Sequence, residues 1–459
     1  MTGPLPIDVV RRFDVAGPRY TSYPTADRFV EAFGAGDLAD ALAQRRATGH
    51  ATPLSLYVHV PFCESLCHYC ACNKIITRKH ERGAAYLREL EREVGLYTEQ
   101  LGTEQPVSQL HLGGSTPTFL SDAELRELLC QLRRAFHLLP GVEQSIEVDP
   151  RTVDAARLRR LHDFGFNRLS FGVQDFDPQV QQAVHRVQPA AQVFALVEAA
   201  RAIGFASVNV DLIYGLPRQT PTSFARTLEQ VARLRPDRIA LYGYAHLPER
   251  FKPQRRILSA DLPLASDKLG MLGQALEAFQ AAGYAYIGMD HFALPDDALS
   301  VAQRQGRLHR NFQGYSTQPD CDLIGLGVSA ISRIGATYSQ NAKTLEEYTD
   351  LLDQGRLPVV RGLALTRDDL ARRAVIMGLM CQGQLLFEAI ETAWLLDFRE
   401  YFASELERLQ DHAALGLVRI DDEGLQVTPS GWYVVRALAM VFDRFVQSDR
   451  NRAKFSRIL

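Results

Sequence analysis

From Leu54 onward, short apolar runs rich in β-branched residues alternate with segments of helical periodicity. This alternation predicts repeated βα units around a parallel sheet, because each amphipathic helix buries its apolar stripe against the strands beside it. Ligands of such sheets bind at the carboxyl ends of the strands, so functional residues are expected there. The predicted strands lie near 55–61, 107–112, 144–149, 168–173, 207–214 and 238–244, and the clearest helices are Ala85–Leu101, Asp122–Phe136, Ala190–Ile203 and Thr222–Leu234.

The pattern changes after these units. Leu264–Gly283 predicts a further helix, and Tyr284–His291 predicts another extended segment. After Thr366 the chain becomes mostly helical, with a hairpin over 417–427 before a final helix that runs on from Tyr433. That order is typical of a small winged-helix domain. The final helix is apolar rather than basic, which indicates packing against a core and not entry into a DNA groove.

Four of the seven cysteines directly follow the first predicted strand, with the spacing Cys-x3-Cys-x2-Cys-x-Cys. Thiolates this close together suit an iron–sulfur cluster or zinc. Structural zinc usually needs a second, separated pair of ligands, and the other cysteines stand alone, as buried apolar residues often do. A disulfide is disfavoured by the odd cysteine count and the lack of a secretory signal. The pattern favours a [4Fe–4S] cluster in which three thiolates leave one iron open. The clustered cysteines are Cys63, Cys67, Cys70 and Cys72, and the isolated ones are Cys130, Cys321 and Cys381.

An open iron beside a strand end is the arrangement of the radical S-adenosylmethionine enzymes. Within that superfamily the chain resembles the oxygen-independent coproporphyrinogen III oxidases over nearly its whole length. The cysteine core alone would indicate only the superfamily, whereas the later segments indicate this family. The segments that carry the resemblance are Gly17–Thr25, Tyr57–Cys63, Ile146–Arg151, Asp211–Pro217, Gly288–Phe292, His309–Tyr315 and Phe455-Ser-Arg.

The resemblance implies an α/β fold with three parts. Residues 51–365 would form the catalytic domain, a partial (β/α)6 TIM-like barrel. Residues 1–50 would form an N-terminal extension that helps to close the substrate cavity. Residues 366–459 would form a C-terminal domain that is mostly helical and winged-helix-like.

The implied activity is that of an oxidoreductase of haem biosynthesis. It would convert two propionates of coproporphyrinogen III to vinyl groups and so give protoporphyrinogen IX. The resemblance implies one [4Fe–4S] cluster and two S-adenosylmethionine molecules. An electron from the cluster would cleave the first of these to a 5′-deoxyadenosyl radical, which removes hydrogen from the propionate before carbon dioxide is lost. The electron donor and the final acceptor are not identified by the sequence.

Site residues are implied by the matching positions of the family. The metal ligands are Cys63, Cys67 and Cys70, and the catalytic residues are Tyr57 and Cys72, of which Cys72 does not ligate iron. The first S-adenosylmethionine is assigned Tyr57, Gly114, Glu147, Phe312 and Ile331. The second is assigned Tyr69, Ser115, Thr116, Gln174, Arg186, Asp211 and Ala245, with Gln313 facing the same region.

The chain departs from the common family pattern in two places. Ser115 stands where most members have a third glycine, so its bulk and hydroxyl bear on the second cofactor. Tyr69 replaces a different aromatic residue and is expected to stack equally well. His59 and His68 lie near the cysteines and are interpreted as supporting residues rather than iron ligands.

Substrate carboxylates need cationic or donor partners, and arginine offers the best fork geometry for them. Candidates by segment are Arg19, His291, His309 and Arg310, although a histidine near a strand end is more often a structural residue.

A formal net charge of −3 gives no indication of nucleic-acid binding, and no apolar run is long enough to span a membrane. An oxygen-sensitive cluster and the absent export signal favour the cytoplasm, and the resemblance implies a monomer. The alternatives are a haem-carrying chaperone, a radical methyltransferase acting on haem, and a structural zinc protein. Chaperone relatives typically carry an aromatic residue in place of Cys72 and lack a segment like Pro18–Pro24, so both features favour the oxidase.

Overall fold

The computed structural model describes residues 12–13, 15–48, 52–318 and 321–448, and these form two compact units. We call the larger one the sheet unit; it comprises Phe29–Met271 and Cys321–Ala364. The other, which we call the helical unit, takes its described residues from Met1–Arg28, Leu272–Asp320 and Leu365–Leu459. Each unit is described by itself.

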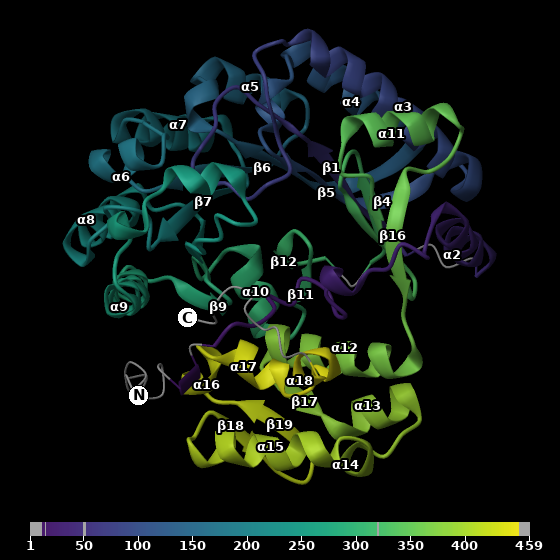
Figure 1. Ribbon diagram of the computed structural model, residues 1–459, viewed down its shortest axis with the longest axis vertical. Coiled ribbons are helices and arrows are strands. Elements are labelled where there is room, and N and C mark those ends of the chain that lie inside the picture. The colour runs from purple at the N-terminus through teal and green to yellow at the C-terminus, as the bar shows by residue number, and fades with distance from the viewer. Residues whose placement is uncertain (1–11, 14, 49–51, 319–320, 449–459) are drawn as a thin grey trace. The chain divides into compact units, whose positions relative to one another are not determined.

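Parallel strands form most of the sheet unit, as the sequence predicts (Figure 1). Each strand pairs in parallel with the next one in spatial order. All six predicted strands are present, and the carboxyl ends of these strands share one edge of the sheet. In spatial order the strands are β13 (Leu323–Leu326), β1 (Leu54–Val60), β4 (Gln105–Gly114), β5 (Phe136–Val148), β6 (Arg168–Gln174), β7 (Ser207–Tyr214) and β8 (Arg238–Gly243).

Helices of the sheet unit lie on the outer side of these strands (Figure 1). Their starts depend on local side-chain chemistry. Ser121 caps α4 in a reciprocal pair with Glu124, and Thr220 does the same for α8 with Ser223. The helices are α2 (Ala35–Ala47), α3 (Glu81–Leu101), α4 (Asp122–Ala135), α5 (Ala155–Asp163), α6 (Pro178–Ala183), α7 (Ala190–Ile203), α8 (Pro221–Leu234) and α11 (Leu345–Asp353), while α9 (Ala265–Ala281) crosses the boundary between the units.

Three further strands extend this sheet beyond β13 in an antiparallel arrangement, which the sequence pattern did not predict. They are β14 (Ile331–Ile334), β15 (Thr337–Asn341) and β16 (Val359–Ala364). Four or five residues in β14 and β15 are too few to show a clear alternation of apolar and polar residues.

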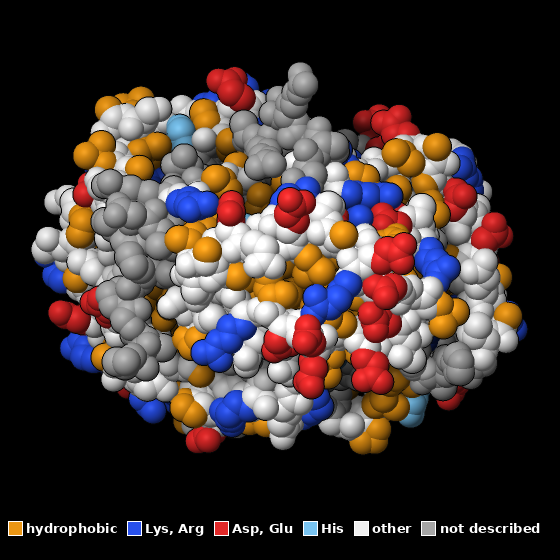
Figure 2. Space-filling view, turned by 90° about the horizontal axis from the view of Figure 1, so that it is seen from below, with side chains coloured by type: hydrophobic (Ala, Val, Ile, Leu, Met, Phe, Trp, Pro, Cys, Tyr) orange, Lys and Arg blue, Asp and Glu red, His pale blue; other side chains and the backbone are white. Residues whose placement is uncertain are grey.

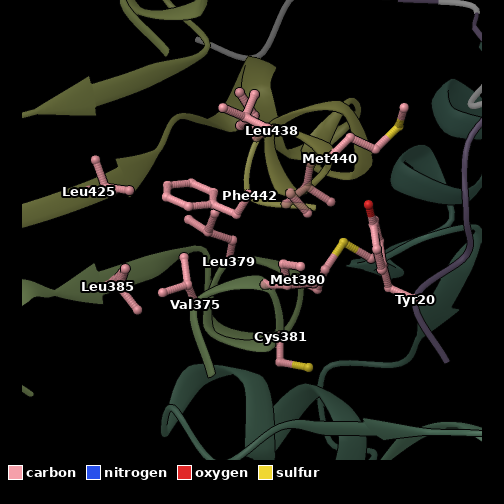
Figure 3. Packing of buried hydrophobic residues seen from close by; sticks show 14 of the residues in the cluster. Tyr20, Val375, Leu379, Met380, Cys381, Leu385, Leu425, Leu438, Met440 and Phe442 are labelled. Atoms are coloured by element: carbon pink, nitrogen blue, oxygen red, sulfur yellow. The ribbon is translucent and has the colours of Figure 1, made fainter. Parts of the chain in front are cut away.

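The helical unit is built from short elements around one apolar core. Figure 3 shows Phe442 packed among Val375, Leu379 and Leu438, while Tyr20 lies beside Met380. Its elements are β9 (Ala285–Gly288), β10 (His291–Ala293), α10 (Ala298–Arg304), β11 (His309–Asn311), β12 (Gly314–Ser316), α12 (Arg367–Gln382), β17 (Gln384–Leu386), α13 (Phe387–Trp394), α14 (Phe398–Tyr401), α15 (Ala403–Ala414), β18 (Val418–Ile420), β19 (Gly424–Val427), α16 (Pro429–Trp432), α17 (Val435–Met440) and α18 (Arg444–Ser448).

Predicted elements of the helical unit are partly confirmed. The hairpin over 417–427 is present as β18 and β19, with β17 paired to β19. The single final helix is wrong, because the chain forms α16, α17 and α18 instead. The Asp443 carboxylate accepts the backbone N–H groups of Phe445 and Val446, at 2.9 and 3.1 Å, and so starts a new helix within the predicted one.

The extended segment predicted over Tyr284–His291 is also divided. Its first part forms β9, and after a turn the chain continues as β10, which pairs with β9 in an antiparallel arrangement. The turn places Gly288, Met289 and Asp290 at φ values of 123°, 43° and 72°. Two of these residues are not glycine, so the turn holds a conformation that L-residues rarely adopt.

Some sequence features lie outside the described residues, namely the segment Phe455-Ser-Arg and parts of the N-terminal extension. In the part of the chain that the structure does describe, no helix has both the length and the apolar character that crossing a membrane requires. The face shown in Figure 2 carries acidic and basic side chains that are interspersed with apolar ones.

Candidate active site at the carboxyl edge of the sheet

The cysteine segment forms a closed loop directly after β1. It leaves through β2 (Phe62–Cys63) and returns through β3 (Ile75–Ile76), which pairs with β2 in parallel. The backbone N–H of Ile75 donates to the carbonyl of Pro61 at 2.7 Å, and that of Thr77 donates to the carbonyl of Cys63 at 2.9 Å. These bonds fasten both ends of the loop that carries the other clustered cysteines.

The middle of the loop is fixed by the segment after α6. The His68 N–H donates to the Val184 carbonyl at 2.9 Å, and the His185 ring contacts the Leu66 carbonyl, also at 2.9 Å. The rings of His68 and His185 stack with their centres 5.3 Å apart. His68 therefore supports the loop through its backbone and its ring, in line with its interpretation as a supporting residue.

Cationic and hydroxyl groups lie beside the thiols. The Cys67 sulfur lies 3.5 Å from a guanidinium nitrogen of Arg186 and 3.7 Å from one of Arg151. The Cys63 sulfur lies 3.0 Å from the Thr116 hydroxyl. Two guanidinium groups and a hydroxyl therefore surround the thiols from which a metal would be bound.

Burial and local contacts shift the thiol pKa values in opposite directions. Burial raises the pKa of Cys63 to about 11. A contact with Cys72 lowers the pKa of Cys70 to about 6 against the opposing effect of burial, and the positive charge of Lys74 adds to this lowering. Lys74 also donates to the Cys70 carbonyl at 3.0 Å. Two of the predicted ligands are therefore thiols in different local environments.

Asp149 joins two arginines beneath the cysteine loop. Its carboxylate lies 3.2 Å from Arg186 and 2.7 Å from Arg151. Burial alone would raise the pKa of Asp149, but Arg186 and then Arg151 hold it below the usual range. Sequence reasoning assigned no role to Asp149 or Arg151. They come directly after β5 in the Asp-Pro-Arg segment, and only folding brings Arg186 to the same place.

The two glycines that end β4 lie against three side chains of the site. A Cβ atom on Gly113 would come within 2.9 Å of both Glu147 and Tyr57. At Gly114, where φ is +116°, it would lie 2.8 Å from the His59 ring. The Gly114 N–H donates to the Glu147 carboxylate at 3.2 Å. Both glycines are therefore needed for this close packing.

Ser115 links the end of β4 to the cysteine loop. Its hydroxyl donates to the Asn73 carbonyl at 3.1 Å, and its N–H donates to the Val60 carbonyl at 2.9 Å. The structure thus accommodates a side chain where the common family form has glycine. Thr116 comes next, buried, with its hydroxyl donating to the Ser115 carbonyl at 2.7 Å.

Tyr57, His111 and Glu147 form a row across β1, β4 and β5. The ring of Tyr57 stacks on that of His111 with centres 5.8 Å apart, and the His111 ring lies 3.3 Å from the Glu147 carboxylate. The Tyr57 hydroxyl contacts His59, whose other ring nitrogen contacts the Asn73 carbonyl. Burial lowers the pKa of His59 and raises that of Tyr57. Both nitrogens of His59 are engaged, and neither contacts a thiol.

Asp211 lies two strands further along the same sheet. Its carboxylate accepts from the Asn209 amide at 2.9 Å and from the Ser170 hydroxyl at 3.3 Å. Burial and then the negative charge of Glu147 raise the pKa of Asp211 to about 7. Such a perturbed pKa in a buried carboxyl group is typical of functional sites.

Gln174 and Arg186 converge on the backbone of Gly172. A Cβ atom at Gly172 would lie 2.9 Å from the terminal nitrogen of each side chain. Arg186 donates to the Gly172 carbonyl at 2.7 Å. Gln174 ends β6 with φ at 68°, where the register to β7 slips. This irregular strand end brings the two predicted residues together.

The remaining predicted residues occupy three places. Tyr69 packs beside the buried cluster that contains Tyr244, and Ala245 comes directly after Tyr244, beyond the end of β8. Ile331 begins β14, in the same unit. Phe312 and Gln313 form the turn between β11 and β12 and belong to the helical unit.

No three His, Cys, Asp or Glu side chains among the described residues are arranged to hold a single metal ion. A cubane cluster does not require three side chains around one ion, because each of its thiolates binds a different iron. The thiol loop, with neighbouring cations and a hydroxyl group, has a donor set that fits a [4Fe–4S] cluster.

Comparison with known proteins gives consistent results. The family model for the radical SAM superfamily matches residues 57–231, and that for the HemN C-terminal domain matches residues 365–434. The chain is 53% identical over 454 residues to the oxygen-independent coproporphyrinogen III oxidase of Pseudomonas aeruginosa, covering 98% of each chain. It is 49% identical to that of Escherichia coli, again covering 98% of each.

A solved structure is similar over nearly the whole chain. It is that of the coproporphyrinogen III oxidase HemN from Escherichia coli, described as a radical SAM enzyme. The TM-score is 0.91 at 48% identity, and the match covers 97% of this chain and 100% of the other. The predicted fold, a radical SAM partial barrel with a mostly helical C-terminal domain, is confirmed.

Proposed function

Because this chain belongs to the oxygen-independent coproporphyrinogen III oxidases of the radical SAM superfamily, we propose that it converts two propionates of coproporphyrinogen III to vinyl groups at the carboxyl edge of the sheet. Family membership makes it an oxidoreductase of haem biosynthesis that uses a [4Fe–4S] cluster and S-adenosylmethionine. When bound, these two groups supply the carbon-centred radical that removes hydrogen from the substrate. The chain's own residues bind and orient these groups and the substrate.

The observation that carries the proposal is the closed thiol loop beside the two glycines that end β4. We assign Cys63, Cys67 and Cys70 as the iron ligands, and the Arg151–Asp149–Arg186 group as the support that holds positive charge against Cys67. Cys72 is exposed at the end of the loop and is assigned a supporting catalytic role without ligation.

We assign the first S-adenosylmethionine to Tyr57, Gly114, Glu147, Phe312 and Ile331. Glu147 supports this assignment because its side chain is 42% exposed although it already binds the Gly114 N–H. Its carboxylate can therefore accept a ribose hydroxyl or an amino group as well. Tyr57, which stacks on His111, forms one side of this proposed S-adenosylmethionine site.

A second S-adenosylmethionine is assigned to Tyr69, Ser115, Thr116, Gln174, Arg186, Asp211 and Ala245, with Gln313 in addition. Asp211 supports the assignment, because a carboxyl group with a raised pKa gains a favourable partner in the positive charge of a sulfonium or ammonium group. The number of cofactors is tested by equilibrium dialysis of the reconstituted enzyme. We expect two molecules bound per chain, and one molecule per chain in the Asp211→Asn variant.

We propose three parts for the chain and a set of partners. Residues 1–50 form an extension, 51–365 the catalytic domain and 366–459 the C-terminal domain; the start of α12 at Arg367 and the family match from residue 365 support the last boundary. We also propose a monomer in the reducing cytoplasm, with no nucleic-acid partner. An electron donor and a final electron acceptor complete the set of partners.

The test is an anaerobic assay of reconstituted protein with dithionite, S-adenosylmethionine and coproporphyrinogen III, monitoring product mass and 5′-deoxyadenosine together. Loss of two carbon dioxide units with formation of deoxyadenosine is expected. A gain of methyl groups on haem would instead show the methyltransferase, and tight haem binding with neither product would show the chaperone.

A further inference from the structure

The helical unit contains a buried arginine whose charge is only partly satisfied. Arg310 lies in the middle of β11 and is 4% exposed. Its Nε donates to the Arg19 carbonyl at 3.3 Å, and its guanidinium carbon lies 4.6 Å from the centre of the Tyr315 ring. Its Nη1 is shielded from solvent and has no hydrogen-bond partner. Neither of its contacts is an anion, although buried charges in proteins are normally paired.

The nearby carboxylate is already engaged. Asp290 pairs with the guanidinium of Arg19 at 2.6 Å, in the turn where Met289 and Asp290 both have positive φ. Burial, and then the charge of Arg310, lower the pKa of His291 to about 4, so this ring is neutral at physiological pH. Asp290 thus pairs with Arg19, and the contacts of Arg310 itself with described residues, a backbone carbonyl and an aromatic ring, include no carboxylate.

A second donor on the same hairpin is also unsatisfied. The side-chain nitrogen Nε2 of Gln313 is buried without a hydrogen-bond partner. Gln313 lies in the turn between β11 and β12, and its backbone N–H is held by the Asn311 side chain at 2.9 Å. Two unpaired donors within four positions of one short hairpin indicate that this hairpin faces acceptors outside the described residues, and Gln313 is assigned to the cofactor side of it.

We propose that Arg310 is the anchor for a propionate carboxylate of coproporphyrinogen III, with Arg19 at the outer end of the same site. This assignment deepens the proposed function and rests on it. A carboxylate supplies the negative charge and the hydrogen-bond acceptor that Arg310 lacks, and arginine binds it through paired N–H groups. The Tyr315 ring fixes the plane of the guanidinium, and so the direction from which a carboxylate binds.

The proposed site is more open at Arg19 than at Arg310. The side chains of Arg19 and Asp290 are 29% and 16% exposed. A propionate therefore reaches Arg310 from the side of Arg19, and the packing around Nη1 must open to admit it.

The experiment compares Arg310→Met with wild-type enzyme in the holoenzyme form. Methionine keeps much of the length and the apolar stem but removes the charge. We expect KM for coproporphyrinogen III to rise about 10- to 100-fold, the effect of one charge-assisted hydrogen bond, while kcat and iron content change little. Arg310→Lys keeps the charge but not the paired N–H groups, so its KM should lie between those of wild type and Arg310→Met. Arg307→Met is the matched control, because Arg307 is exposed and contacts the Gln305 side chain.

Binding is measured separately from turnover with coproporphyrin III and its tetramethyl ester, by fluorescence. Wild-type protein should prefer the free acid, and Arg310→Met should lose that preference. The melting temperature of Arg310→Met should stay within about 5 °C of wild type, because removal of an unpaired buried charge offsets the lost contacts.

Two results would overturn the inference. One is equal affinity of wild-type protein for the acid and the ester. The other is an unchanged KM in Arg310→Lys together with a large fall in melting temperature for Arg310→Met, which would make Arg310 a structural residue. In a third outcome, wild-type enzyme yields no decarboxylated product and still prefers the free acid over the ester. If Arg310→Met then loses that preference, the carboxylate site stands and the proposed function fails.

Discussion

Gly114 meets two requirements at once, since its φ of +116° is unfavourable for other residues and its α-carbon faces the His59 ring at close range. Gly114→Ala should therefore lower the free energy of unfolding by about 2–4 kcal/mol, from backbone strain and overpacking together. The matched control is Gly141→Ala, where φ is +77° but no atom lies within 4 Å of the added carbon. Urea unfolding measures both, and equal losses would show that space around Gly114 is not limiting.

Iron ligation and turnover should separate within the cysteine loop. We expect Cys63→Ser, Cys67→Ser and Cys70→Ser to abolish cluster binding, and Cys72→Ser to keep iron but lose turnover. Iron and sulfide analysis after anaerobic reconstitution, with the oxidase assay, provides the measurement. Full iron and activity in Cys67→Ser would contradict the ligand assignment.

Asp211 should make stability depend on pH. Its pKa is about 7 in the folded state against an ordinary value of 3.8. A carboxyl group with a raised pKa contributes its full stability below the unfolded-state pKa of 3.8, and this contribution is lost as the pH rises through the folded-state pKa of about 7. When the pH is raised from 5 to 8, the free energy of unfolding of cofactor-free wild-type protein should therefore fall by on the order of 1–3 kcal/mol more than that of Asp211→Asn. Urea titrations at both pH values test this, with the exposed Asp350→Asn as control; parallel curves would contradict it.

The residues of the site were predictable to different degrees. Glu147, next to the end of β5, can be placed at this edge from the βα pattern, since parallel strands end together, and Asp211 can be placed on a strand of the same sheet. Asp149 and Arg186 could not be paired in advance, because 37 positions separate them and the contact depends on the loop after α6. The hydroxyl of Ser115 likewise finds its acceptor, Asn73, only in the fold.

At the scale of elements, α3 supports the site from behind through one buried carboxylate. Glu93 accepts hydrogen bonds from the Tyr348 hydroxyl at 2.6 Å, the Gly327 N–H at 2.7 Å and the Asn341 amide at 2.7 Å. These partners belong to α11, to the turn after β13 and to β15. That turn leads to Ile331, so Glu93 holds the backbone from which this proposed cofactor contact projects.

Glu93→Gln should lower the free energy of unfolding by about 1–3 kcal/mol, because the amide leaves one buried donor unpaired. KM for S-adenosylmethionine should rise as well, through displacement of the turn before Ile331. Denaturant unfolding and initial rates are the measurements. The control is Glu91→Gln, on the same helix, where the side chain is 57% exposed. If both variants behave like wild type, Glu93 does not hold the turn.

Long elements were predictable and short ones were not. The parallel strands and α3, α4, α7 and α8 are indicated by periodicity over many residues. The antiparallel strands β14 and β15 are too short for that, and the predicted last helix is interrupted because Asp443 caps α18. Local capping chemistry prevailed there over an apolar pattern that by itself favours one continuous helix.

For the molecule as a whole, the helical unit joins segments from both ends of the chain. The Tyr20 hydroxyl donates to the Asp443 carboxylate at 2.9 Å across 423 positions, and Tyr20 is fully buried. The Arg436 guanidinium donates to the Gly17 carbonyl at 2.9 Å. The N-terminal segment is therefore part of the core of this unit.

Tyr20→Phe should reduce the free energy of unfolding by about 1–2 kcal/mol, since a buried carboxylate loses one donor while the ring packing is kept. Tyr433→Phe is the control, because the hydroxyl of Tyr433 accepts a hydrogen bond from Gln280 in an exposed place. Chemical denaturation monitored by circular dichroism compares them. An unchanged midpoint for Tyr20→Phe would show that the contact adds nothing to the core.

The bond between Tyr20 and Asp443 also sets a time order during synthesis on the ribosome. At about 5–20 residues per second, roughly 20–85 s pass between the appearance of the two residues. The segments of the sheet unit are all translated within that interval. The earliest described part of the polypeptide is therefore among the last to reach its final place, because the Tyr20 hydroxyl has no acceptor until Asp443 has been translated.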